Sequence, residues 1–577
     1  MLNKAGYLSL LCLILVGINC YAQEEKSYLK NQTYTYDELI RTYRSLAKGN
    51  EFLSITEAGK SDIGKAIHVV VISKNGDVTP REARKKGMSI LLINNGIHAG
   101  EACGIDASVE LARKLSNPKH ELHKTLDSVV VLIIPVYNVG GILNRGSFSR
   151  VNQNGPEEHG FRGNAKNLDL NRDFIKLDSR NAKTFTTLFR AWDPDIFIDT
   201  HTTNGSDHQY TLTLINTQKD KLNPVLSQFA EREMVPAFFR GMNKKEMEMI
   251  PYVYNFKSSP DQGIKSFLET PRYSSGYTAL FDCFSFITEA HVYKPFAQRV
   301  QHTLGLLETV VSYAAENSYT IQQKRKEGRE HTKSQVQFPL EWELDTMRFE
   351  LIPFNGYATI FRKSELTNQE MMFYNREKPF SEEIGYYNSF KPKVVVVKPE
   401  FYVVPQAYEA VIERMLLNDV KITIIERDTL ADLQVYYIAE YKSPKTPYEG
   451  HFLHSDIEVK KSQERIQLYE GDYLIEVNQE ANRYIVETLE PQSVDGFFAW
   501  NFFEGILQQK EWFSDYAFEP KAIQFLEENP QIKKEFENKK VADKNFAKNS
   551  WAQLYYIYKK SPYYEKTVNR FPVYRIE

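Results

Sequence analysis

Two side chains that commonly bind metals stand three residues apart in the first quarter of the chain. His98 and Glu101 follow Ser89–Ile93, a nearly continuous apolar run of the kind found in strands buried on both faces. A His-x-x-Glu pair alone is weak evidence, because about one such pair is expected by chance in a chain with 12 histidines. Its position between a predicted strand and a predicted helix favours a site over a surface turn.

Two further polar side chains stand at the ends of other predicted strands. His201 follows Asp195–Asp199, and Glu289 follows Cys283–Thr288. Ligands of open α/β sheets bind beyond the carboxyl ends of the strands, so we expect all four groups at one site. Two imidazoles and one carboxylate suit a catalytic zinc ion, which keeps one position for water, whereas structural zinc prefers four protein ligands, usually cysteines. Glu289 is then the natural general base for that water.

A segment rich in Asn and Arg separates the two halves of this predicted site. It runs from Arg162 to Phe174 and includes Asp169, Asn171 and Arg172. An arginine held near a metal can bind a carboxylate through two hydrogen bonds or polarise a carbonyl. The alternative is a solvated loop of mixed charge, and the neighbouring metal-binding candidates favour a role in the site.

In this order, the motifs resemble those of the zinc carboxypeptidases of the carboxypeptidase A/B family. The resemblance extends from about Tyr28 to Ser318, roughly half of the chain. It implies one zinc ion per catalytic domain as cofactor and the C-termini of peptides or proteins as substrate. The implied roles are zinc binding by His98, Glu101 and His201, base catalysis by Glu289, oxyanion stabilisation by Arg162, binding of the terminal carboxylate by Asn171 and Arg172, and orientation of His98 by Asp169.

The chain also departs from that family pattern. Gly100 and Ala102 flank the ligand Glu where many members have Arg and Trp, which removes a substrate contact. The tyrosine that covers the family's site is ambiguous here, and we choose Tyr273, with Tyr277 as the alternative. These departures leave the implied metal chemistry intact and leave the side-chain preference open.

The elements that would position these residues alternate between strands and helices. Ile67–Ser73 and Val129–Val136 are further predicted strands, and Ile105–Leu115 and Asn181–Ala191 are predicted helices. This alternation predicts an α/β fold with a mixed, mostly parallel central sheet flanked by helices.

The chain has 577 residues, which predicts more than one domain. Residues 1–22 have one positive charge, a short apolar run and a small residue at the end, and we interpret them as a signal peptide. Residues 24–320 form the predicted catalytic domain, and residues 334–577 a mixed α+β accessory domain. The charged stretch Gln322–Ser334 is either a linker or a solvated helix end.

Three patterns describe the predicted C-terminal domain. The strand Val394–Val397, a helix near Gln406–Leu417 and the strand Lys421–Ile425 form a predicted β-α-β unit. Short strands are predicted at Tyr473–Val477 and Tyr484–Thr488, and a helix from Asn529 to Lys540.

The net charge, the hydrophobic stretches and the number of cysteines limit the classes of partner and the location that we expect. The net charge of -3 gives no global electrostatic reason to expect a nucleic acid. After signal cleavage no apolar stretch is long enough to span a membrane, so we expect a secreted or periplasmic protein. Four cysteines exclude a disulfide-stabilised scaffold, and we expect Cys103 and Cys283 of the mature chain to be free thiols. The oligomeric state is open.

The sequence therefore predicts a secreted zinc metallocarboxypeptidase. One alternative is a zinc amidase or deacylase that acts on cell-wall peptides or N-acyl amino acids with the same metal. A second alternative is a peptide-binding protein without activity, which the retention of Glu289 disfavours, because a binding protein needs no base.

Overall fold

The computed structural model describes residues 27–76, 78–203, 205–253 and 258–577. The predicted signal peptide, residues 1–22, lies outside these ranges. Among the helices of the described ranges, none combines the length and the hydrophobicity needed to cross a membrane.

The chain divides into two compact units that are interleaved in sequence. The first unit contains the residues up to Arg329 together with Leu344–Lys391, and the second contains Glu330–Glu343 and Pro392–Glu577. The predicted domain boundaries stay a prediction.

An eight-stranded mixed sheet forms the centre of the first unit, in the order β1-β2-β4-β3-β5-β9-β6-β7. The four central strands β4, β3, β5 and β9 are parallel to their neighbours within this group. Every residue of β3 and β5 is buried, which explains their continuous apolar runs. The strands are β1 (Leu53–Lys60), β2 (Ala66–Ile72), β3 (Ser89–Asn95), β4 (Val129–Ile134), β5 (Ile196–Thr203), β6 (Leu212–Asn216), β7 (Met249–Pro251) and β9 (Phe284–His291).

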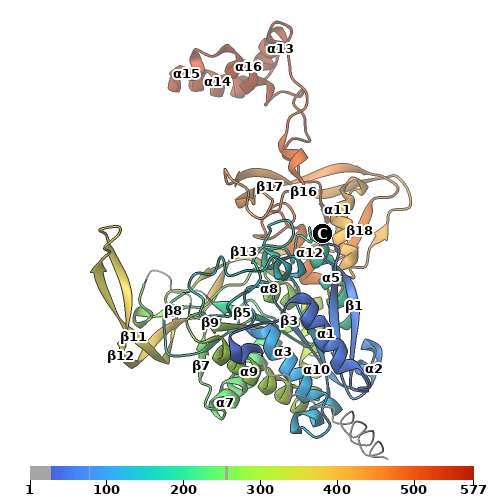
Figure 1. Ribbon diagram of the computed structural model, residues 1–577. Helices are drawn as coiled ribbons and strands as arrows, with labels where there is room; N and C mark the ends of the chain where they lie inside the picture. Colours follow the sequence, from blue (N-terminus) through green and yellow to red (C-terminus); the bar gives the residue numbers. More distant parts are fainter. Residues whose placement is uncertain (1–26, 77, 204, 254–257) are drawn as a thin grey trace, which may run out of the picture. The chain divides into compact units, whose positions relative to one another are not determined.

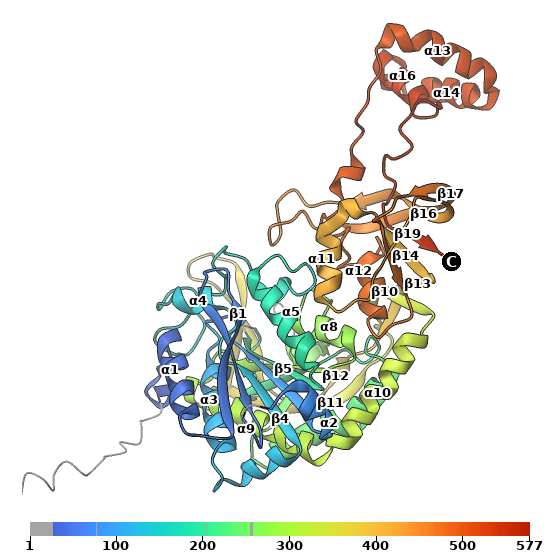
Figure 2. The same ribbon diagram turned by 90° about the vertical axis from the view of Figure 1, so that its right-hand side faces the viewer.

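Helices cover both faces of this sheet, as Figure 2 shows. On one face α3 (Cys103–Leu115) packs against α9 (Phe296–Glu316), and on the other lie α5 (Arg180–Trp192) and α8 (Ser274–Thr278). The α/β prediction, its five strands and its two helices are thus confirmed. Smaller helices are α1 (Tyr36–Ala47), α2 (Pro80–Lys85), α4 (Val139–Leu143), α6 (Pro224–Phe229) and α7 (Val235–Asn243).

The charged stretch Gln322–Ser334 belongs to a helix, α10 (Ser318–Ser334), so the linker interpretation was wrong and the helix alternative is confirmed. One of its charges is not solvated. Arg325 is 3% exposed and its guanidinium contacts Asp193 and Asp195 at 2.9 and 2.8 Å. These carboxylates lie just before β5, so α10 is bound to the base of the sheet by buried ion pairs.

A long hairpin completes the first unit. Strands β11 (Glu350–Lys363) and β12 (Glu370–Tyr387) pair along their length, and β12 continues onto β8 (Ile264–Lys265) in parallel. Figure 1 shows this hairpin as a yellow arm. At its base Phe354 and Ile384 are buried against Tyr210, Ile250, Val253 and Ile264. The hairpin therefore contributes to the core of the unit that contains the predicted site.

The second unit contains a six-stranded sheet in the order β15-β18-β14-β19-β16-β17. Its strands are β14 (Phe401–Val404), β15 (Thr423–Ile424), β16 (Thr429–Lys442), β17 (Ser455–Leu468), β18 (Tyr473–Glu476) and β19 (Tyr574–Ile576), and β10 (Gln337–Leu344) pairs separately with β13 (Phe390–Val397). Its helices are α11 (Glu409–Leu417), α12 (Asn482–Leu489), α13 (Asp515–Glu528), α14 (Pro530–Ala542), α15 (Lys544–Ala547) and α16 (Ser550–Tyr558).

Two predictions for this unit were wrong. The first strand of the β-α-β unit is β14, because β13 lies in a different sheet. The predicted strand Tyr484–Thr488 is part of helix α12, all of whose residues are buried. The strand near Tyr473 and the helix after Asn529 are confirmed as β18 and α14.

Candidate active site

Three neighbouring parallel strands bring the predicted residues to one edge of the sheet. His201 lies within β5 and Glu289 within β9, and the two residues are direct partners in the register of these strands. His98 and Glu101 lie in the short connection from β3 to α3, where Gly96 turns the chain with φ of +63°. A hydrogen bond from the Glu101 N–H to the His98 carbonyl, 2.9 Å long, closes that turn.

His98, Glu101 and His201 form a compact, buried group. One nitrogen or oxygen from each lies within 4.8 Å of the others, and no other such group of three occurs in the part of the chain that the structure describes. His98 Nδ1 lies 3.1 Å from Glu101 Oε1, and His201 Nδ1 lies 3.1 Å from Glu101 Oε2. The two Nδ1 atoms and the carboxylate therefore face a common point.

The other nitrogen of each histidine faces a second carboxylate. His98 Nε2 lies 3.0 Å from Asp169 Oδ1, and His201 Nε2 lies 3.0 Å from Asp199 Oδ2. A carboxylate in this place favours the tautomer with the proton on Nε2, which leaves Nδ1 as the lone-pair donor. A hydrogen bond supports this tautomer at His98, and at His201 the nearby Asp199 carboxylate favours it by its charge.

A zinc ion fits these residues. His98 Nδ1 is a buried nitrogen without a hydrogen-bond partner, which costs free energy unless another group satisfies it. Two imidazoles and one carboxylate are the ligand set of many catalytic zinc sites. His98, Glu101 and His201 would hold the ion.

Burial and neighbouring charges move the pKa values of the acidic groups in opposite directions. Burial alone would raise the pKa of Glu101, but the charges of His98 and Arg150 and the hydrogen bond with His201 hold it well below its usual value. Burial raises the pKa of Glu289 to about 8 against the lowering effect of His201. Glu101 is therefore a carboxylate, and Glu289 is a group that exchanges a proton near neutral pH.

The predicted arginines line the same cavity as the metal-binding group. Arg162 Nη2 lies 2.8 Å from Asp169 Oδ2 and its Nη1 lies 3.7 Å from Glu101 Oε1, while 46% of its side chain is exposed. The Arg172 guanidinium stacks 4.4 Å from the centre of the Tyr273 ring. Asn171 accepts a 3.0 Å hydrogen bond from the Ser274 N–H through Oδ1, so its NH₂ group is the part that can donate to a ligand.

All of these groups line one cavity of about 650 Å³. The structure thus brings together His98, Glu101, His201, Glu289, Arg162, Asn171, Arg172 and Tyr273. The alternative tyrosine, Tyr277, is fully buried away from the cavity, with its hydroxyl 3.4 Å from Thr186. The remaining lining residues are Ser149, Arg150, Phe161, Thr202, Thr203, Ile215, Tyr252, Phe267 and Ile287.

Sequence reasoning missed several residues of the site. Arg150 donates to Glu101 Oε1 at 2.9 Å, and Asp199 faces His201 and accepts a 2.6 Å hydrogen bond from Ser274. Asp199 could have been found, because it stands two residues before His201 and therefore on the same face of the strand. Nothing in the spacing around Arg150 distinguishes it from a surface arginine.

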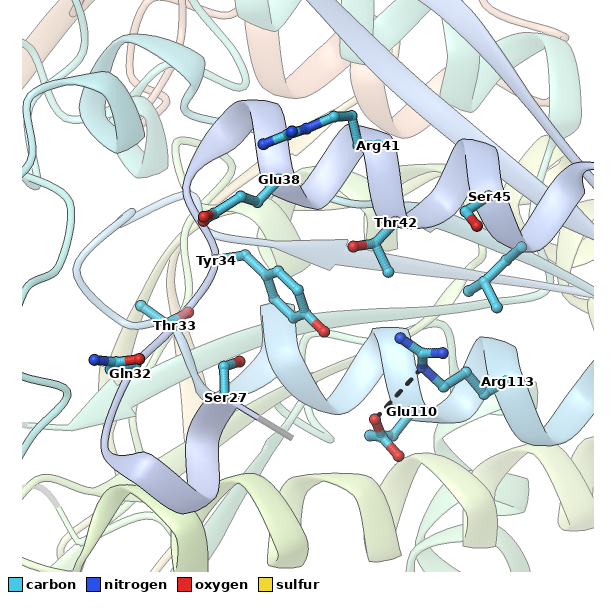
Figure 3. A pocket seen from close by; sticks show the side chains of 11 residues that line it. Ser27, Gln32, Thr33, Tyr34, Glu38, Arg41, Thr42, Ser45, Glu110 and Arg113 are labelled. Atoms are coloured by element: carbon cyan, nitrogen blue, oxygen red, sulfur yellow. Dashed lines mark ion pairs between the residues drawn. The ribbon is translucent and has the colours of Figure 1, made fainter. Parts of the chain in front are cut away.

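A second cavity, of about 500 Å³, lies away from this site between α1 and α3. Figure 3 shows its lining, in which Arg113 pairs with Glu110 at 3.7 Å and Tyr34 lies close by. The residues drawn there bring no histidine or cysteine together, and the three ligand candidates of the chain lie in the other cavity. The cavity of His98 is therefore the one of these two that contains the predicted metal ligands.

Comparison with known proteins agrees with this geometry. Residues 40–304 match the family model of the zinc carboxypeptidases. Carboxypeptidase 2 of Trichophyton rubrum is 21% identical over 480 residues, which cover 80% of this chain and 83% of that protein. Carboxypeptidase 2 of Trichophyton tonsurans is 20% identical over 482 residues, with coverages of 80% and 83%.

Solved structures of metallocarboxypeptidases are more distant. A metallo-carboxypeptidase from Pseudomonas aeruginosa is 17% identical with a TM-score of 0.37, and the match covers 49% of this chain and 70% of that one. Carboxypeptidase A from Helicoverpa armigera is 15% identical with a TM-score of 0.36, over 53% and 80% of the two chains. Residues 40–304, a little under half of the chain, are thus similar in sequence to the zinc carboxypeptidases, and every residue that lines the cavity of His98 lies within this segment.

Proposed function

We propose that this chain is an exported zinc metallocarboxypeptidase that removes residues from the C-termini of peptides or proteins. The observation that carries the proposal is the convergence of three buried metal-ligand candidates, a protonatable Glu289 and two arginines in one cavity. Each group supports a distinct step of peptide hydrolysis.

Zinc held by His98, Glu101 and His201 would act as a Lewis acid toward a water molecule and the substrate carbonyl. Glu289 would accept a proton from the attacking water and pass it to the nitrogen of the leaving amine. Burial raises the pKa of Glu289 to about 8, and the positive charge of a bound zinc ion would lower it toward the carboxylate form that accepts a proton.

The arginines would divide the substrate's negative charges between them. Arg162 is exposed to the cavity and would stabilise the oxygen that becomes negative during attack. Arg172 and the NH₂ group of Asn171 would bind the terminal carboxylate, which an arginine fork matches in charge and geometry. Tyr273, stacked on Arg172, would cover the bound end of the peptide.

The apolar part of the cavity supports a preference for apolar or aromatic terminal residues. Ile287 and Ile215 are partners in the register of β9 and β6, and Ile287 stands two residues before Glu289, so its side chain lies on the same face of the strand. Tyr252 and Phe267 complete this wall. A charged side chain placed here would lose its hydration without an opposite charge among these lining residues.

The accessory domain and the location of the enzyme are further parts of the proposal. We assign catalysis to residues 24–320 and a supporting role to residues 334–577, with the hairpin Leu344–Lys391 packed on the catalytic part. The signal peptide interpretation of residues 1–22 supports export to the periplasm or the medium.

Peptides with free and with amidated C-termini, incubated with and without a chelator and followed by mass spectrometry, test the proposal. We expect stepwise loss of terminal residues from the free peptides alone, abolished by the chelator and restored by zinc. Equal cleavage of amidated peptides would favour the amidase or deacylase alternative. Peptide binding without cleavage in the presence of zinc would favour the non-catalytic alternative.

A further inference from the structure

Arg150 connects the two segments that carry the predicted metal ligands. It precedes a turn at residues 151–152, and only 15% of its side chain is exposed. Its Nη1 donates to Glu101 Oε1 at 2.9 Å, and its Nη2 donates to the carbonyl of Thr202, next to His201, at 3.0 Å. One rigid guanidinium therefore contacts both the loop after β3 and the strand β5.

These contacts fix the plane of the Glu101 carboxylate. Oε1 accepts from Arg150, while Oε2 accepts from the Thr202 N–H at 2.8 Å. On their other sides the same oxygens face His98 Nδ1 and His201 Nδ1, at 3.1 Å each. With a donor on each oxygen, rotation of the carboxylate breaks a hydrogen bond to a charged group, which is among the stronger kinds in proteins.

Gly100 and Gln153 accommodate and hold the Arg150 side chain. A Cβ atom at Gly100 would lie 2.7 Å from Arg150 Cδ and 2.7 Å from the Gly160 carbonyl oxygen, so a larger residue would displace the arginine or the backbone. Gln153 accepts from Arg150 Nε at 2.6 Å and donates to the Gly100 carbonyl at 3.0 Å. The absence of a side chain at Gly100 therefore leaves the space that the Arg150 side chain occupies next to Glu101.

Arg162 is not an equivalent of Arg150. Its nearest approach to Glu101 is 3.7 Å, and its short contacts are to Asp169. Its side chain is three times as exposed, 46% against 15%. Arg162 is thus exposed enough to contact a substrate, whereas Arg150 is buried against the metal-ligand candidate Glu101.

We propose that Arg150 is a positioning residue that holds Glu101 in the orientation required for metal binding. The proposal rests on the proposed zinc site and concerns the affinity and geometry of that site. Groups that orient metal ligands typically contribute 10- to 100-fold to metal affinity.

The test is a competition for zinc between the protein and a chelating dye of known affinity. We expect Arg150→Gln to bind zinc about 10- to 100-fold more weakly than the parent. Arg150→Lys should fall between them, because an ammonium group cannot reproduce the fork that reaches Glu101 and Thr202 together. Gly100→Ala should also weaken zinc binding although Arg150 is retained.

Arg145→Gln is the matched control. Arg145 lies in the same segment, is 16% exposed and donates to the carbonyls of Thr33 and Tyr34 away from the site. Its loss should leave zinc affinity unchanged. The melting temperature of each variant without metal reports whether it folds like the parent.

Cobalt substitution gives a second measurement. We expect the visible absorption of the Co²⁺ form to differ between Arg150→Gln and the parent, because the coordination by Glu101 changes. Unchanged zinc affinity together with an unchanged cobalt spectrum in a folded Arg150→Gln would overturn the proposal. A parent that binds no zinc would instead contradict the metal site itself, so the two failures are distinguishable.

Discussion

At the scale of single residues, two glutamates of the same cavity have opposite acid–base properties. Glu101 touches two imidazoles and an arginine, and its pKa is held below its usual value despite burial. Glu289 is partly exposed to the cavity, and desolvation raises its pKa to about 8 because fewer charges compensate it. Environments that separate the pKa values of two carboxyl groups are typical of sites that divide the roles of ligand and base.

The role of Glu289 can be separated from metal binding. Glu289→Gln should keep zinc and peptide affinity and lower kcat by about 10²- to 10⁴-fold, the usual contribution of a general base. Zinc content and single-turnover kinetics measure this. Glu110→Gln, which removes a charge in the other cavity, should retain activity. Turnover within about tenfold of the parent would assign the proton transfer to another group.

The cysteines give a second test at this scale. Cys103 and Cys283 are both free and fully buried, and burial raises the pKa of the Cys283 thiol to about 12. We expect the folded protein lacking residues 1–22 to be inert to a thiol reagent. When the protein is unfolded without reductant, titration should detect two reactive thiols per chain. Their absence would mean that the two cysteines form a disulfide.

At the scale of elements, strands β6 and β9 hold Ile215 and Ile287, which line the cavity and which we propose to contact the terminal side chain of the substrate. If Ile287 and Ile215 contact the terminal side chain, peptides that end in Phe or Leu should be preferred over those that end in Lys. Ile287→Asp should reduce the ratio of kcat/KM for Phe over Lys by about 10- to 100-fold, as changes in an apolar pocket commonly do. Zinc content should remain that of the parent. An unchanged ratio would place the specificity pocket elsewhere.

Two buried histidines, His208 and His291, lie where the β11–β12 hairpin contacts the rest of the first unit. The rings of His208 and His291 lie with their centres 4.3 Å apart at an angle of 49°, and Asp207 bridges His291 to Arg376 of the hairpin. Burial, followed by the charges of His291 and Lys294, holds the pKa of His208 well below its usual value. His208 is therefore neutral when folded and becomes protonated only on unfolding.

This difference predicts a pH effect on stability. The unfolded chain binds a proton at His208 below about pH 6.5, so the free energy of unfolding falls as the pH falls through that range. The loss between pH 6.5 and 5.5 is about 1 kcal/mol for a histidine that stays neutral in the fold. We expect His208→Gln to show a smaller drop in melting temperature from pH 7.5 to 5.5 than the parent. Equal drops would show that His208 is not responsible.

The elements also show what the sequence can and cannot predict. The buried strands were recognisable because both of their faces are apolar, and His98, Glu101, His201 and Glu289 were found because each stands where a strand ends. Helix α12 was mistaken for a strand because every one of its residues is buried, which removes the periodicity that distinguishes a helix. Its branched residues then favoured a strand.

The other errors have a different physical origin. Gln322–Ser334 resembles a solvated linker, and only its contacts with Asp193 and Asp195, over 120 positions earlier, show that Arg325 is buried. Arg150 likewise has its significant contacts 49 and 52 positions away, at Glu101 and Thr202. The pattern of residue types within a short segment does not show which distant residues its side chains will contact.

At the scale of the whole molecule, the family match and the compact unit differ in extent. The match ends at residue 304, whereas the first unit also requires α10 and the hairpin Leu344–Lys391. Phe354 and Ile384 of the hairpin are at most 2% exposed. Burial of each such side chain contributes about 1.5–3 kcal/mol, so the hairpin is a substantial part of the stability of the unit.

Truncation tests this requirement. A chain that ends at Ser334 should expose the partners of the hairpin, bind a hydrophobic dye and melt at a lower temperature than the full chain. A chain that ends at Lys391 retains the hairpin and should bind zinc with the affinity of the full protein. Equal dye binding and equal melting of the two fragments would show that the hairpin is dispensable.

The interleaving of the two units also affects how such a protein can evolve. The chain passes from the first unit to the second after Arg329, returns at Leu344 and leaves again after Lys391. A single recombination event at any of these three junctions would transfer an incomplete unit, with part of its core left in the other gene. Any contiguous segment that contains all of the second unit also contains the hairpin Leu344–Lys391 of the first, so the two units cannot be exchanged independently by such an event.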